Sequence, residues 1–91
     1  MSIKINLFYP NLQEYIGNLK SVYVKGDTVG ECLQDFVRRF HGAERFLFDD
    51  KENYLRHVFV YINAESSNKA RLNESVRDGD EIIIAVLVTG G

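Results

Sequence analysis

The chain has 91 residues, which is enough for one hydrophobic core and therefore predicts a single domain spanning residues 1–91. Hydrophobic residues make up 45% and charged residues 26%, a composition that excludes a disordered chain. The formal net charge is −2 and lysines and arginines are scattered, so nucleic acid is not expected as a partner. No signal peptide and no apolar run of the ~20 residues that span a bilayer are found, so we expect a cytoplasmic protein without a membrane partner.

The first third of the chain predicts two strands. Residues 3–8 alternate between apolar and polar side chains, which predicts a strand that ends at Pro10. Residues 11–18 are interpreted as a turn or loop because Gly17 and Asn18 interrupt the pattern. Alternation returns over residues 21–25, and the spacing of the two strands suggests an antiparallel pair.

The strongest local signal is a helix that begins after Thr28. Thr28 and Glu31 have the spacing of a capping box, in which each residue satisfies an unpaired backbone N–H group. Gly42 follows the pattern where a left-handed residue commonly ends a helix. The apolar residues recur at the spacing of one buried helix face, and they are Val29, Cys32, Leu33, Phe36, Val37 and Phe40.

Residues 43–56 are less regular, and their aromatic and aliphatic side chains are expected to fold over the end of the helix. Residues 57–63 predict a strand with Phe59 and Tyr61 on the face opposite Val58 and Val60.

The last third predicts a short edge strand near residues 70–72 and a single helical turn at residues 73–76. Asp78-Gly79-Asp80 is a strong turn signal. Residues 82–88 are apolar at successive positions, which is typical of a central strand buried on both faces.

This order of elements predicts an α+β fold of the β-grasp kind. The sheet is expected to be mixed, with four to five strands, and one main helix should cover one face. The first and last strands are expected to be parallel neighbours at its centre.

The side chains with possible catalytic or metal-binding chemistry do not form a site in this sequence. Cys32 lies on the predicted buried helix face, which favours a packed core thiol over a nucleophile. His41 and His57 lack the paired spacing of metal ligands, and Asp49-Asp50 with Glu52 lack the alternation of a cation-binding loop. We therefore expect no bound metal or cofactor and no enzymatic activity of the chain itself.

The chain ends at Thr89-Gly90-Gly91, directly after the predicted central strand. With residues 3–8, 26–29, 60–63 and 77–82, this ending resembles the ThiS/MoaD family of ubiquitin-like sulfur carriers over nearly the whole length. The length and the stretch from Arg56 to Asn63 favour the MoaD-like and CysO-like branch of that family.

The resemblance implies that an E1-like adenylating enzyme of the MoeB/ThiF type uses ATP to activate the Gly91 carboxylate. A sulfur donor would then form a thiocarboxylate, which a sulfur-accepting synthase would use in molybdopterin, thiamine or cysteine biosynthesis. Thr89, Gly90 and Gly91 would enter the partner's active site as part of a flexible tail, residues 88–91. The free carrier is expected to be a monomer.

Two other functions remain open on the sequence. The same terminus could join the chain to lysines of other proteins, as in a ubiquitin-like modifier. The domain could also be a non-covalent interaction module in which the two glycines are incidental.

A docking surface is expected on the sheet face that the helix does not cover. Phe8, Phe59, Tyr61 and Leu87 are its candidate partner-binding residues, because exposed aromatic clusters often mark partner sites. Alternatively, residues 43–54 fold over some of these side chains.

Overall fold

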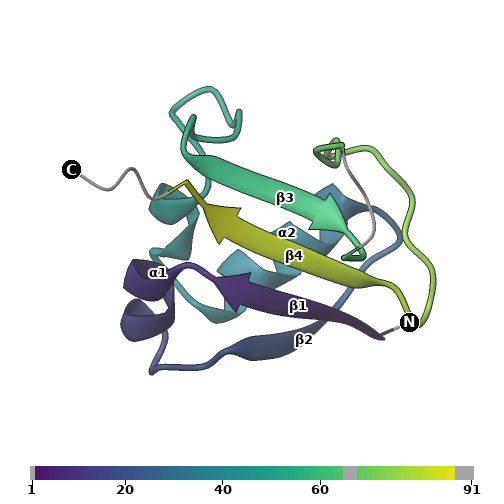
Figure 1. Ribbon diagram of the computed structural model, residues 1–91, viewed down its shortest axis with the longest axis horizontal. Coiled ribbons are helices and arrows are strands. Elements are labelled where there is room, and N and C mark those ends of the chain that lie inside the picture. Colours follow the sequence, from purple (N-terminus) through teal and green to yellow (C-terminus); the bar gives the residue numbers. More distant parts are fainter. Residues whose placement is uncertain (1, 65–67, 88–91) are drawn as a thin grey trace.

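A four-stranded mixed sheet with one long helix across one face forms the domain (Figure 1). The computed structural model describes residues 2–64 and 68–87. In chain order its elements are β1 (Ser2–Phe8), α1 (Pro10–Tyr15), β2 (Ser21–Lys25), α2 (Val29–Arg39), the 3₁₀ helix η1 (Ala43–Phe46), β3 (Val58–Ile62) and β4 (Glu81–Val86). The predicted α+β fold of the β-grasp kind is confirmed.

The sheet has the strand order β2-β1-β4-β3. β1 pairs antiparallel with β2 and parallel with β4, and β3 pairs antiparallel with β4. The first and last strands are therefore the parallel central pair, as predicted.

The core lies between this sheet and α2. Every second residue of the strands is buried against the helix, as Ile3, Ile5 and Ile84 illustrate. α2 contributes its buried face, formed by Val29, Cys32, Leu33 and Phe36. Each large apolar side chain buried here contributes roughly 1.5–3 kcal/mol to stability, so this interface is the main source of folding free energy.

The predicted capping box starts α2. The backbone N–H of Glu31 donates to Thr28 Oγ1 at 3.1 Å. Glu31 Oε1 accepts from the backbone N–H of Asp27 at 2.9 Å, one residue before the position of the standard motif. Both contacts satisfy backbone donors, and they hold the chain at the end of β2 against the first turn of the helix.

The expected loop at residues 11–18 was wrong over its first part, where α1 forms. Pro10 lies in the first turn, where its missing N–H costs nothing, and the backbone N–H of Gln13 donates to the carbonyl of Tyr9 at 2.9 Å. Leu12 and Ile16, four residues apart, are buried in the core. Burial of this short apolar face stabilises a helix that propensity alone does not favour.

The expected edge strand near residues 70–72 and the helical turn at 73–76 were also wrong for the described chain. Ala70 makes one backbone hydrogen bond to the carbonyl of Val60, at 2.7 Å, and residues 70–72 form no strand. Ser75 forms an isolated antiparallel bridge with Thr28. The segment is extended there because it must satisfy the backbone around the start of α2.

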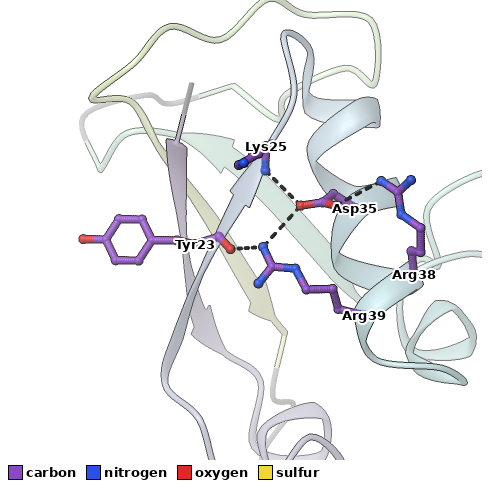
Figure 2. A network of polar contacts seen from close by, with 5 residues as sticks. All are labelled: Tyr23, Lys25, Asp35, Arg38 and Arg39. Carbon is purple, nitrogen blue, oxygen red and sulfur yellow. Dashed lines mark hydrogen bonds and ion pairs between the residues drawn. The ribbon is translucent and has the colours of Figure 1, made fainter.

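The outer edge of β2 is occupied by side chains of α2 (Figure 2). Asp35 Oδ2 accepts from the backbone N–H of Lys25 at 2.9 Å, and Arg39 donates to the carbonyl of Tyr23. Asp35 also pairs with Arg38 at 3.0 Å and with Arg39 at 3.2 Å. An open strand edge invites pairing with another chain, so these contacts protect β2 from strand addition.

Asp35 should therefore contribute measurably to stability, in a pH-dependent way. The hydrogen bond from the Lys25 backbone, with smaller contributions from Arg39 and Arg38, holds the pKa of the Asp35 carboxyl below its usual value. Asp35→Asn should lower the free energy of unfolding by about 1–2 kcal/mol at pH 7, measured by urea denaturation.

The Asp35 contribution should be complete above the ordinary carboxyl pKa of about 4 and should be lost as pH falls through the lowered pKa. Asp50→Asn, in an exposed turn, is the matched control and should leave stability unchanged. Equal stability of the Asp35→Asn variant and the wild type at pH 7 would contradict this role.

Cys32 should be unreactive in the folded protein. Its side chain is fully buried, and burial, with smaller contributions from Asp35, Glu31 and Asp27, raises the pKa of the thiol to about 11. Modification by a disulfide reagent at pH 8 should be about 100-fold slower in buffer than in denaturant. Rates that agree within tenfold would show that the thiol is accessible.

Candidate functional site

The sheet face opposite α2 carries all four residues predicted to bind a partner. Phe8 and Leu87 are 62% and 61% exposed, and Phe59 and Tyr61 are half-buried. Phe8 and Phe59 both pair with Ala85, one from each neighbouring strand, so the two rings flank β4 on the same face.

Strand register places these side chains as neighbours on one face, toward the end of β4. Tyr61 pairs with Ile83, the residue two positions before Ala85 and so on the same face. Leu87 lies two positions after Ala85, and its N–H donates to the carbonyl of His57 at 3.0 Å. We call this surface the open patch; its members are Phe8, Phe59, Tyr61, Ile83, Ala85 and Leu87.

Residues 43–54 do not cover the most exposed part of the patch. Ala43 and Leu47 are buried in the core, and Phe46 packs against the ring of Tyr9, with centroids 5.9 Å apart. The segment packs its apolar side chains into the domain, and Phe8 and Leu87 remain exposed.

The same sheet face is polar at its other end. Lys4 and Glu81 are neighbours in the register of β1 and β4, and Asn6 Nδ2 donates to the Glu81 carboxylate. The face therefore changes from polar to apolar along β4, and its apolar end is the end from which the chain leaves the sheet.

The last described residue, Leu87, belongs to the open patch. Thr89, Gly90 and Gly91, and the expected flexible tail at 88–91, lie outside the described residues. The chain that carries the diglycine therefore starts within the patch, a few residues from its end.

A shallow pocket of about 310 Å³ adjoins the patch at the same end of β4. Tyr9 Oη donates to the carbonyl of Phe46 at 2.9 Å and lies 3.2 Å from His57 Nε2. Since the Tyr9 proton is already donated, His57 Nε2 is the donor in the second contact. The lining residues are Tyr9, Pro10, Asn11, His57, Val86 and Leu87.

This pocket was not predicted from the sequence. The pocket was missed because α1, which shapes one wall, was missed. Pro10 and the four-residue spacing of Leu12 and Ile16 together indicate that helix. His57 is exposed and its ring contacts Tyr9 at the rim of this pocket.

A larger groove of about 1150 Å³ runs beside α2. Val37, Phe48 and Leu72 line it among acidic and basic side chains, and no residue of β4 borders it. Across the described chain, no group of three or more His, Cys, Asp or Glu side chains is placed to bind a metal ion. None of the described helices is long and apolar enough to cross a membrane.

Comparisons with known proteins agree with this geometry. SAMP1 of Haloferax volcanii superposes with a TM-score of 0.83 at 32% identity, over 100% of each chain. The Amycolatopsis orientalis BexX/CysO complex contains a chain that matches with a TM-score of 0.80 at 32% identity, over 98% of this chain and 99% of that one. Mycobacterium tuberculosis CysO matches with a TM-score of 0.78 at 27% identity, over 94% and 99%.

A search of curated protein sequences returns no significant match. The sequence model of the ThiS family matches residues 7–91, which is nearly the whole chain. These findings support a small ubiquitin-like sulfur carrier or modifier, rather than an enzyme in its own right. The chain belongs to the ThiS family.

Proposed function

We propose that this protein is a sulfur carrier whose Gly91 carboxylate is adenylated by an E1-like enzyme and converted to a thiocarboxylate. The observation that carries the proposal is the position of the open patch: exposed apolar side chains lie beside the point where the diglycine-bearing chain leaves β4. A partner that binds the patch receives the terminus at a defined place.

The chemistry requires activation because a carboxylate is a poor acyl electrophile. Attack of a Gly91 carboxylate oxygen on the α-phosphorus of ATP forms an acyl adenylate and releases pyrophosphate. Hydrosulfide then attacks the carbonyl carbon, AMP leaves, and the thiocarboxylate remains with the loss of one proton. The carrier supplies no acid, base or metal; the partner enzyme binds ATP.

Glycine suits the terminus for steric reasons. Residues without Cβ allow unusual backbone angles and close approach to a bound nucleotide. Four extended residues, 88–91, reach roughly 13 Å at ~3.3 Å per residue, which is enough to enter a recessed site. A side chain at position 91 would crowd the carbon under attack.

The proposed partners are an E1-like adenylating enzyme of the MoeB/ThiF type, a sulfur donor and a sulfur-accepting synthase. The similarity to the CysO chain of the BexX/CysO complex supports an assembly with a partner protein. The proposed setting is the cytoplasm, with the free carrier a monomer. Molybdopterin, thiamine and cysteine biosynthesis are the candidate destinations of the sulfur.

A protein modifier is the second candidate function. It is favoured by the 32% identity to SAMP1, a protein of the kind named small archaeal modifier protein. Both functions begin with adenylation of Gly91, so they differ in whether sulfur or a lysine amine attacks the adenylate.

The first test is the mass of the intact chain after incubation with the activating enzyme, ATP and sulfide. Formation of the thiocarboxylate should add about 16 Da to the mass of the chain, because sulfur replaces one oxygen of the Gly91 carboxylate. Removal of Gly90 and Gly91 should abolish the mass change while the thermal unfolding midpoint stays the same, because these residues follow β4.

No mass increase with an enzyme that is competent on its own carrier would contradict the proposal. Retained function without the two glycines would instead identify a non-covalent interaction module. Gly91 in isopeptide linkage to lysines of cellular proteins would establish the modifier function.

The second test concerns the open patch. Phe8→Ser and Leu87→Ser should each raise the KM of the activating enzyme for the carrier by about tenfold or more, because exposed apolar anchors dominate docking energy. Pyrophosphate exchange would measure the effect. Tyr23→Ser is the control within the same face: Tyr23 is 59% exposed and pairs with Lys4 at the polar end, so the change should alter KM by less than about twofold. Equal effects at all three positions would exclude a localised patch.

A further inference from the structure

The charged side chains of the open sheet face are unevenly distributed between its two ends. The strands place Lys4, Lys25 and Glu81 on this face, and Lys69 lies over Phe59 at its margin. Asp78 and Asp80 bond to Ser2 and Asn63 at the polar end of the face, so acidic groups lie there and Lys69 is the charge beside the apolar end. The groove beside α2 is bordered by charges of both signs, among them Lys25 at the end of β2.

Lys69 is the cation nearest the apolar patch. Its Nζ lies 4.1 Å from the centre of the Phe59 ring, within the range of a cation–π contact. The next residue is anchored to β3, because the Ala70 N–H donates to the carbonyl of Val60 at 2.7 Å. Lys69 is exposed, and the ion pairs among the described residues join Asp35 to Arg38 and Arg39 only.

From this arrangement we propose that the activating enzyme meets the open face with an acidic surface, and that Lys69 selects for a carboxylate at the margin of the patch. The inference rests on the proposed function and adds the charge of the partner. The proposed partner surface belongs to one protein, the activating enzyme. It is apolar opposite Phe8, Phe59 and Leu87, and negatively charged beside Lys69.

Desolvation favours an acidic partner there. When a protein surface covers Phe59, the ammonium group of Lys69 loses water. An apolar partner would leave that charge without a hydrogen-bond acceptor, which is costly, whereas a carboxylate would pair with it. The charge of Lys69 also attracts an acidic surface over distances of about a Debye length, ~10 Å at 0.1 M salt.

A graded series at position 69 tests the inference. The probe is the purified MoeB/ThiF-type enzyme of the same organism, and the measurement is the KM for the carrier in pyrophosphate exchange at 50 mM salt. Lys69→Arg should behave as wild type, because it keeps both the charge and the ring contact. Lys69→Met should raise KM about threefold and Lys69→Glu about tenfold, with kcat unchanged, since a charge at the margin acts mainly on association.

Salt and a distant control separate charge from packing. At 0.5 M salt the differences should shrink to within about twofold, because exposed charges are screened. Lys51→Glu makes the same change of charge in the exposed turn between Asp50 and Glu52, which border the groove beside α2. It should change KM by less than about 1.5-fold, as expected for a charge outside the interface.

The outcomes are distinguishable. A wild-type KM for Lys69→Glu, a Lys69→Met variant that binds as well as Lys69→Arg, or an equal effect of Lys51→Glu would overturn the inference and leave the proposed function intact. Failure of the wild-type chain to be adenylated by the enzyme would overturn the proposed function and the inference with it.

Discussion

A single helix can cover only one face of a four-stranded sheet, and the rest of this structure depends on that limit. α2 buries one side of each strand, as Ile5 of β1 and Ile84 of β4 illustrate. The side chains on the other side must then be polar where they face water, or apolar where a partner covers them. Both occur here: Lys4 and Glu81 lie at one end of the face and the open patch at the other. Exposed apolar area of this kind is typical of a docking site.

Other parts of the chain form hydrogen bonds to both edges of the sheet. β2 and β3 are the edge strands. Asp35 and Arg39 satisfy backbone groups of β2 that would otherwise invite another strand, and Ala70 satisfies a carbonyl of β3. With these edge groups occupied, the open face is the surface best suited to a partner, and its apolar end coincides with the end of β4.

Local patterns predicted most of the elements, and the errors share a cause. The capping pair Thr28 and Glu31, the alternation of β1 and the apolar run of β4 are local signals, and each gave the correct element. α1 was missed because six residues are too few for a helix to form on propensity, and only burial of Leu12 and Ile16 stabilises it. The segment around Ser75 was misjudged because its partner, Thr28, is far away in the sequence.

The sequence by itself determined the fold class, the buried face of α2 and the diglycine ending, because periodicity, capping and composition are local properties. It also placed Phe59 and Tyr61 opposite Val60, since side chains alternate along a strand. Tertiary structure alone decided that Phe8 and Phe59 flank Ala85, that Lys69 lies over Phe59, and that Ala43 and Leu47 pack into the core. These relations depend on strand register and on contacts between distant segments, which no local pattern specifies.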